Sequence, residues 1–381
     1  MGLRITTMLD ISFSFSVLWL RIAIKRFTFK ADRMLDGRLY LQDVVELLLK
    51  PRSYSMYGIN GVAVRSNKLQ YVDHFFTVIK LNSVTVRAPA TTANLGPGFD
   101  SLGLALGLWN ELTVTRGKFL VTATGEGVDI VPQDTRNLVV TGLEAVFNYI
   151  DEPVPGLRYE CSNVIPFARG LGSSSAAIVT GLIAGSAMSG ADLTNEEITT
   201  LAADIEGHPD NVAPAIYGGC TVGVRNGTDN WIVDQVNIPE ELCAVIFVPE
   251  VQTNTHESRA VLPDQISRSD AVFNIGRAAM LVNALSSGRL ELLKYATDDR
   301  LHQPHRAQGF KAMPQLIDAA IKGGAHGAFL SGSGPSVLAL ATGREVTISY
   351  EMTETARTLG VDGKAMILPV AQGGASVLSS S

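Results

Sequence analysis

The chain has 381 residues, which is enough for two domains of ordinary size. Hydrophobic residues make up 46% of the sequence and charged residues 18%, a balance that fits a well-buried core and excludes global disorder. The 31 basic and 37 acidic residues give a formal net charge of -6, and no basic block stands out, so the composition argues against a nucleic-acid partner.

The first 81 residues differ from the rest and carry no recognisable chemistry. The apolar run from Ile11 to Leu20 is too short for a bilayer, which needs roughly 20 such residues, so we expect no membrane partner. No charged segment followed by a small-residue cleavage site is present, so a signal peptide fits poorly. A short strand and one helix ending before Pro51 could form here. We expect residues 1–81 to be an extension of unknown role outside the main fold, with a targeting segment or an added subdomain as alternatives.

The regular part of the chain begins at Asn82 with alternating apolar and polar residues. Strands are predicted at 83–89, 110–115 and 157–165. The apolar, small-residue run 173–190 predicts a buried helix, and Thr194 with Glu197 forms a capping box that opens the next helix.

A second half of the chain begins with a buried strand predicted at 244–250. The later elements are a helix at 313–324 and two strands, 327–331 and 336–341, around a glycine turn. The pattern therefore predicts a mixed chain of helices and strands, which we divide into domains at 82–238 and 239–381.

Three cysteines, Cys161, Cys220 and Cys243, lie far apart and form no CxxC pair. This spacing argues against a disulfide framework or a zinc site, and it fits a protein of the reducing cytoplasm.

The most informative segment is a glycine- and serine-rich loop before the predicted buried helix. Gly170 and Gly172 permit positive φ and leave room for a phosphate, while Ser173 to Ser175 occupy the position of an N-cap. A serine hydroxyl can also bind Mg²⁺, and Arg169 could add positive charge. The alternative is an ordinary glycine turn capped by serine. The loop is neither a Walker A sequence nor a dinucleotide fingerprint.

The exact string of this loop, PFARGLGSSSAA, resembles the phosphate loop of the GHMP kinases, the family of galactokinases, homoserine kinases, mevalonate kinases and phosphomevalonate kinases. Two further motifs follow the family's order: APATTANLGPGFDSLGLAL at 88–106 resembles the opening motif of homoserine kinases, and FLSGSGPSVLAL at 329–340 resembles the family's third motif. The resemblance covers about residues 82–381. It implies an α+β, two-domain GHMP kinase fold, with an N-terminal domain like ribosomal S5 domain 2 and a ferredoxin-like C-terminal domain.

The resemblance also implies an ATP site and a metal site. The implied ATP-binding residues are Pro166, Phe167, Ala168, Arg169, Gly170, Leu171, Gly172, Ser173, Ser174, Ser175, Ala176 and Ala177. Ser174 and Glu206 are the implied ligands of Mg²⁺, and together with Asn211, a partner of the reacting hydroxyl, they make up the implied catalytic set. Many relatives place extra residues between the equivalents of Glu206 and His208, so the match is imperfect here.

A substrate site follows from the same resemblance. Its implied members are Asn94, Asp100, His208, Thr255, Arg259, Arg306 and Gly332. Asp100 suits an ammonium group, while the two arginines can clamp one carboxylate in planar, bidentate geometry. Taken alone, Asp100 could be an ordinary turn residue, and each arginine could be a solvated charge on the surface. Metal binding by the His302–His305 pair is not expected, because no acidic partner stands in a matching motif.

A substrate with one ammonium and one carboxylate needs both charges in its pocket. The resemblance therefore implies ATP-dependent phosphorylation of the side-chain hydroxyl of L-homoserine. Another GHMP kinase, acting on mevalonate or a sugar, and a non-catalytic nucleotide-binding relative are the alternatives. Homodimers are common in the family, so a homodimer is expected. Asp210 lies where some relatives have a base, but homoserine kinases are not thought to use it.

Overall fold

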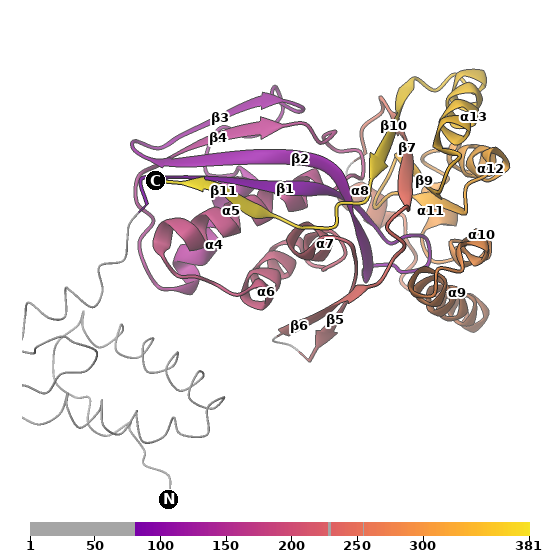
Figure 1. Ribbon diagram of the computed structural model, residues 1–381, viewed down its shortest axis with the longest axis horizontal. Coiled ribbons are helices and arrows are strands. Elements are labelled where there is room, and N and C mark those ends of the chain that lie inside the picture. Colours follow the sequence, from indigo (N-terminus) through magenta and orange to yellow (C-terminus); the bar gives the residue numbers. More distant parts are fainter. Residues whose placement is uncertain (1–80, 228–229, 254) are drawn as a thin grey trace, which may run out of the picture. The chain divides into compact units, whose positions relative to one another are not determined.

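The computed structural model describes residues 81–227, 230–253 and 255–381 (Figure 1). Our expectations for residues 1–80, including the short strand and the helix before Pro51, lie outside this part of the chain. Nothing among the described residues is a helix long and apolar enough to cross a membrane.

The first half of the described chain contains both strands and helices. In order, its elements are β1 (Ser83–Ala93), β2 (Leu102–Arg116), β3 (Leu120–Gly125), α4 (Leu138–Tyr149), β4 (Leu157–Asn163), α5 (Ser173–Ser189), α6 (Asn195–Glu206), α7 (Val212–Tyr217), β5 (Cys220–Asn226) and β6 (Asn230–Val236). The capping box expected at Thr194 and Glu197 is confirmed, with Thr194 as the N-cap of α6.

The second half begins with the buried strand that was expected from the apolar run. Its elements are β7 (Cys243–Pro249), α8 (Thr255–Ala260), α9 (Arg268–Ser286), the 3-10 helix η2 (Leu290–Leu292), α10 (Leu293–Ala296), α11 (Gln303–Arg306), α12 (Met313–Gly323), β8 (Gly327–Leu330), β9 (Val337–Ala341), α13 (Glu345–Thr358), β10 (Gly363–Pro369) and β11 (Ser376–Ser380).

The strands form two sheets. The seven-stranded sheet has the order β11-β1-β2-β4-β3, with β5 paired to β2 and β6 to β5. Figure 1 shows α4, α5, α6 and α7 along one face of this sheet. The last strand of the chain, β11, returns to this sheet and pairs antiparallel with β1.

The four-stranded sheet is antiparallel, with the order β10-β7-β9-β8. Numbered along the chain from β7, this order is 4-1-3-2, and helices separate the first strand from the second and the third from the fourth. That connectivity is the β-α-β-β-α-β arrangement of a ferredoxin-like domain. The predicted mixture of helices and strands is therefore confirmed.

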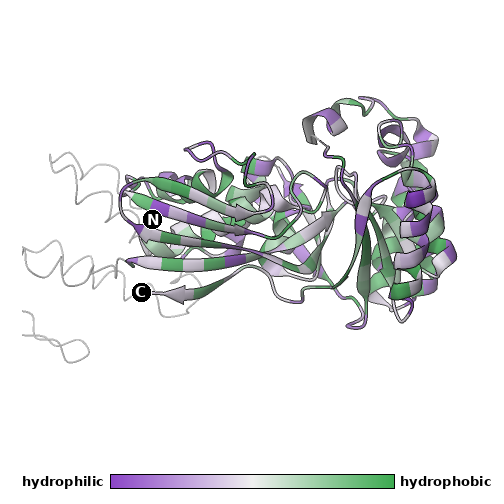
Figure 2. Ribbon diagram, turned by 90° about the horizontal axis from the view of Figure 1, so that it is seen from above, coloured by the Kyte–Doolittle hydropathy of each residue, from purple (hydrophilic) through white to green (hydrophobic). Residues whose placement is uncertain are grey.

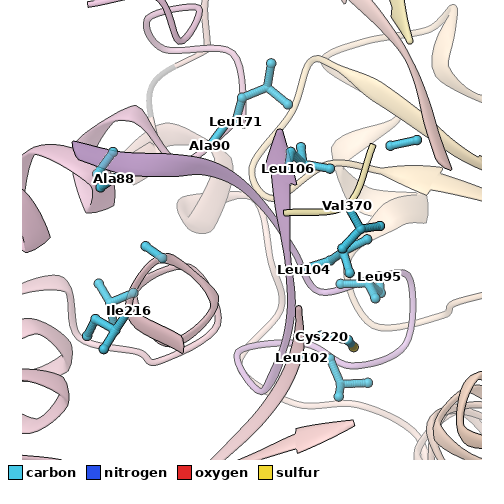
Figure 3. Close-up of a cluster of buried hydrophobic side chains, with 14 of the residues drawn as sticks. Ala88, Ala90, Leu95, Leu102, Leu104, Leu106, Leu171, Ile216, Cys220 and Val370 are labelled. Carbon is cyan, nitrogen blue, oxygen red and sulfur yellow. The ribbon is translucent and has the colours of Figure 1, made fainter. Parts of the chain in front are cut away.

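One hydrophobic core extends from the first sheet into the second. It joins Leu104 and Leu106 of β2 with Ile246 of β7, Leu338 of β9 and Val370, all less than a tenth exposed. Figure 3 shows Leu104, Leu106 and Val370 near one another beside the bend of the long strands. Because apolar side chains of both sheets share this core, its burial stabilises the two halves together.

Hydropathy along the chain follows the same architecture. Figure 2 shows hydrophobic and hydrophilic residues interspersed along the strands of the first sheet. In the four-stranded sheet, by contrast, β7, β8 and β9 are almost wholly buried, as their unbroken apolar sequences predict.

Candidate active site

The phosphate loop ends at the start of α5, whose first turn contains Ser173, Ser174 and Ser175. The sequence placed these serines at the N-cap, but the structure corrects this, because Gly172 is the N-cap with φ 67°. Gly172 provides no side-chain cap, so the first-turn amides of this 17-residue helix remain available to a ligand. Such amides at the positive end of a helix form a natural anion site.

Close packing around the loop explains its glycines. A Cβ atom on Gly172 would lie 1.9 Å from Oγ1 of Thr91, and one on Gly170 would lie 2.1 Å from the carbonyl oxygen of Ser331. The hydroxyl of Ser331 is 2.6 Å from the carbonyl oxygen of Gly170. The loop is therefore held between β1 and the glycine turn of the third motif.

The guanidinium of Arg169 faces backbone carbonyls. It donates from Nε to Pro249 (2.7 Å), from Nη1 to Phe167 (2.8 Å) and from Nη2 to Glu250 (2.6 Å). The backbone of Thr253 also donates to the carbonyl of Ala168, at 3.0 Å. In this arrangement Arg169 ties the loop to the end of β7, a role that differs from the expected one of adding charge at a phosphate.

Glu206, the last residue of α6, faces the first turn of α5. Its Oε1 accepts hydrogen bonds from Ser174 Oγ (3.1 Å) and Ser175 Oγ (3.2 Å). Burial raises the pKa of Glu206 above its ordinary value. A half-buried carboxylate beside two hydroxyl oxygens is a set of hard oxygen donors, which suits Mg²⁺, so the residues present fit the implied metal.

Asn211 is positioned by a residue that the sequence interpretation missed. The Oδ1 of Asn211 accepts a hydrogen bond of 2.9 Å from Oγ1 of Thr91, which is fully buried. The backbone N–H of Thr91 donates to the carbonyl of Leu171 in the phosphate loop, at 3.1 Å. Thr91 lies inside the opening motif, close in sequence to that motif's asparagine and glycines. This position is the signal that could have singled it out.

His208 and Asp210 form a hydrogen-bonded pair through Nδ1 and Oδ1. Burial lowers the pKa of His208, but the hydrogen bond and the charge of Asp210 outweigh burial and raise that pKa above its ordinary value. The ligand atoms of Asp100, His208 and Asp210 all lie within 4.8 Å of one another. Two acidic groups thus gather around one imidazole at this end of the site.

The opening motif brings Asp100 to Arg259 of α8. The guanidinium donates two hydrogen bonds of 2.8 Å, one to each carboxylate oxygen. The ring of Phe99 lies 5.4 Å from the guanidinium carbon of Arg259 and 5.6 Å from that of Arg306. The sequence interpretation missed Phe99, whose ring is an aromatic contact for both arginines.

Arg306 ends α11 and is only 8% exposed. It donates to the carbonyls of Ser258 (3.2 Å) and Gly332 (2.8 Å), and Nη1 is 3.2 Å from Nδ1 of His302. Burial, together with the charge of Arg259, lowers the pKa of Arg306 to about 10, so the guanidinium remains a cation at neutral pH. A buried cation held by neutral acceptors favours an anionic ligand.

Gly332 and Asn94 connect the motifs. Asn94 donates from Nδ2 to the carbonyl of Gly332 at 3.2 Å, and its Oδ1 accepts the backbone N–H of Asp100 at 3.1 Å. The backbone N–H of Gly332 donates to Ala93. Thr255 is the first residue of α8, the short helix that carries Arg259.

The predicted residues therefore meet in one region around β1 and the starts of α5 and α7. A separate cavity of about 610 Å³ lies elsewhere on the second half, lined by residues such as Glu250, Phe310, Lys311 and Leu359. None of the predicted site residues lines it, so we place the chemistry at the motif residues.

Comparisons with known proteins bear on the same segments. The family model described as GHMP kinases N terminal domain matches residues 137–219, and the model described as GHMP kinases C terminal matches residues 280–356. The homoserine kinase of Synechococcus sp. is 39% identical over 298 residues, which cover 77% of this chain and 97% of that protein.

Two further relatives extend the comparison. The homoserine kinase of Desulfitobacterium hafniense is 42% identical over 297 residues, covering 77% of this chain and 100% of that protein. The crystal structure of homoserine kinase from Cytophaga hutchinsonii superposes with a TM-score of 0.71 at 30% identity, covering 78% of this chain and 98% of that one.

Proposed function

The chain belongs to the GHMP kinase family, and because its similar relatives are homoserine kinases we propose that it transfers the terminal phosphoryl group of ATP to the side-chain hydroxyl of L-homoserine. The product is O-phospho-L-homoserine, an intermediate of threonine biosynthesis. The observation that carries the choice of substrate is the meeting of Asp100, Arg259 and Arg306 around Phe99.

Each of the two charges of an amino acid would face an opposite charge among these three residues. Asp100 would take the ammonium, while Arg259 and the buried Arg306 would take the carboxylate. Mevalonate offers a carboxylate but no ammonium, and galactose offers neither. The presence of Asp100 beside the arginines therefore favours an amino-acid substrate over the two alternatives from the same family.

The phosphates of ATP would lie at the first turn of α5. There the amides after Gly172 and the positive helix end would bind the phosphate oxygens, while the packed loop excludes side chains from this space. Phosphoryl transfer depends mainly on positioning and on neutralising charge, and this rigid loop serves the first requirement.

Ser174 and Glu206 would hold Mg²⁺, which supplies charge neutralisation at the phosphates when bound. The half-buried carboxylate of Glu206, which accepts hydrogen bonds from two serine hydroxyls, offers the negative charge that such an ion needs. Magnesium dependence is part of the proposal, as are a homodimer and a cytoplasmic location.

Asn211 would orient the substrate hydroxyl, with Thr91 fixing the Asn211 side chain from the opposite side. Asp210 is 2% exposed and engaged by His208, so we propose that the phosphate itself, and not Asp210, accepts the hydroxyl proton. The His208–Asp210 pair would then contribute to the charge of the substrate pocket and not to proton transfer.

The experiment that tests the function is ADP release by the full chain with Mg-ATP. The substrates are homoserine, mevalonate, galactose and serine, with a reaction lacking any substrate as the blank. We expect turnover with homoserine far above the other three. Turnover with mevalonate or galactose would keep the family and overturn the roles of Asp100, Arg259 and Arg306. ATP binding without turnover of any substrate would favour the non-catalytic alternative.

A further inference from the structure

His302 lies between two parts of the substrate pocket, and the proposed function assigns it no role. Its side chain is completely buried. Nε2 is 2.8 Å from the carbonyl oxygen of Gly96 in the opening motif, and Nδ1 is 3.2 Å from Nη1 of Arg306. One imidazole thus contacts both the loop that presents Asp100 and the arginine that would bind the carboxylate.

Hydrogen-bonding chemistry determines where the imidazole proton lies. A guanidinium has donors only, so Nδ1 of His302 must accept from Arg306. The carbonyl of Gly96 accepts only, so Nε2 must carry the proton and donate. The neutral Nε2–H tautomer satisfies both neighbours, whereas a second proton on Nδ1 would face the Arg306 cation. Both ring nitrogens are engaged, so His302 has no free nitrogen for a metal.

The local fold fixes the ring in this position. His302 and Arg306 are four residues apart across α11, a spacing that places their side chains on one helix face. The buried carboxylate of Asp299 accepts the backbone N–H groups of Leu301 (2.9 Å), His302 (3.0 Å) and Gln303 (2.7 Å). The same carboxylate accepts a hydrogen bond of 2.7 Å from Nδ2 of Asn274 on α9, so the start of α11 is anchored to a neighbouring helix.

We infer that His302 is a positioning residue that directs Arg306 at the substrate carboxylate and couples this arginine to the opening loop through Gly96. The inference rests on the proposed function, because it assigns the carboxylate of an amino-acid substrate to Arg306. Arg306 has a long, flexible side chain, and its backbone-carbonyl partners Ser258 and Gly332 lie on other segments. His302 is the partner on its own helix and therefore sets the direction in which the guanidinium leaves α11.

Two substitutions separate the two hydrogen bonds. In His302→Gln the amide reaches the position of Nε2, so the contact with Gly96 can persist while the acceptor for Arg306 is lost. In His302→Asn the amide oxygen takes the position of Nδ1, so the acceptor for Arg306 is kept and the donor to Gly96 is lost. His326, whose ring bonds to Thr342 Oγ1 at 2.7 Å outside the site, supplies the matched control His326→Gln.

The readout is the steady-state kinetics of two substrates, homoserine and 3-aminopropan-1-ol, which keeps the ammonium and the hydroxyl but lacks the carboxylate. We expect His302→Gln to raise the KM for homoserine about tenfold, as loss of one hydrogen bond to a charged group does, and to leave kcat and the KM for ATP within about twofold. His302→Asn should raise this KM by no more than about threefold. The kcat/KM for 3-aminopropan-1-ol should change by less than about twofold in both variants.

The inference is overturned if His302→Gln lowers kcat/KM equally for both substrates, or if His302→Asn is the more damaging variant. A wild-type enzyme that ignores homoserine would instead refute the proposed function. A heteronuclear NMR spectrum of the histidine ring nitrogens of the wild-type protein gives an independent result if a variant fails to fold. The proton on Nε2 of His302 at neutral pH supports the inference, and a proton on Nδ1 overturns it.

Discussion

Asp100 and Arg259, 159 residues apart in the sequence, neutralise each other through two hydrogen bonds of 2.8 Å. These are the side chains assigned to the two opposite ends of the substrate. Their side chains are 32% and 44% exposed, and an ion pair at such a position contributes about 1 kcal/mol or less. A zwitterion can therefore open this pair at low cost, because it gives each partner a new opposite charge.

This exchange predicts strong discrimination against ligands with a single charge. 4-Hydroxybutanoate, which lacks the ammonium, would separate the pair and leave Asp100 without a cation, so its kcat/KM should be at least about 100-fold below that of homoserine. In Asp100→Asn the discrimination should fall to about tenfold or less, since no carboxylate is left unpaired. Competition kinetics with the two substrates measure both ratios.

A matched control is Asp134→Asn, which removes the carboxylate from another hydrogen-bonded Asp–Arg pair, Asp134–Arg136, outside the site. It should leave the ratio at its wild-type value. Unchanged discrimination in Asp100→Asn would remove Asp100 from ammonium recognition.

Thr91→Val tests how Asn211 is oriented. Valine has nearly the shape of threonine but cannot donate the 2.9 Å hydrogen bond to Oδ1 of Asn211. We expect kcat to fall about tenfold with the KM for ATP nearly constant, because the substrate hydroxyl is positioned less well. Thr85→Val on the same strand, whose hydroxyl contacts only Thr113 in the described chain, is the control. Equal kcat in Thr91→Val and Thr85→Val would argue against the role of Thr91.

Gly172→Ala tests the close packing of the phosphate loop. The new Cβ would lie 1.9 Å from Thr91 Oγ1, so the loop must shift, and displacement of the α5 amides should lower kcat/KM for ATP at least about 100-fold. Gly288→Ala is a matched control, because φ is 69° there and no described atom lies within 4 Å of the added carbon. That control carries only the backbone strain of a non-glycine residue at positive φ, about 1–2 kcal/mol. Similar ATP kinetics in both variants would mean that the clash is relieved without moving the loop.

Asp210→Asn distinguishes a pocket residue from a catalytic base. Because Asp210 is buried and paired with His208, we expect the variant to retain kcat within about tenfold, with the larger effect on the KM for homoserine. A general base contributes about 100-fold or more to kcat. A loss of that size at constant KM would identify Asp210 as the base and contradict proton transfer to the phosphate.

Local sequence patterns predicted the elements that depend on local chemistry. The capping box at Thr194, the buried strand at Cys243–Pro249 and the helix at Met313–Gly323 were all expected, since capping and apolar runs are encoded within a few residues. The sequence did not predict α9 as a helix. Its apolar side chains include the exposed Val272 and Ile275, so no single buried stripe marks the helix.

Contacts between distant segments could not be predicted in the same way. The β11 strand pairs with β1 from the far end of the chain, and His302 contacts Gly96 across 206 residues. The motifs indicated that Asp100 and Arg259 share a pocket, but not that they form an ion pair with each other. Such pairing depends on the arrangement of both sheets and leaves no periodic signal in the sequence.

The pH dependence of stability provides a further test of the neutral state of His302. Burial lowers the pKa of His302 below its ordinary value of 6.5, and the charge of Arg306 lowers it further, against the opposing effects of Asp299, Gly96 and Asp100. Because the unfolded chain then binds a proton more readily than the folded one, His302 should make the free energy of unfolding fall as pH drops below about 6.5. Above that pH its contribution is constant.

The measurement is urea unfolding of wild type and His302→Gln between pH 5 and 8, in steps of about half a unit across the histidine range. Glutamine does not titrate, so the difference between the two proteins isolates His302 from the remaining histidines. We expect the wild-type free energy of unfolding to decline more steeply below about pH 6.5 than that of the variant. A wild-type curve that is equally steep or shallower would mean that His302 takes up a proton at least as readily in the folded protein as in the unfolded chain, which contradicts an Nδ1 atom held as the acceptor of the Arg306 hydrogen bond.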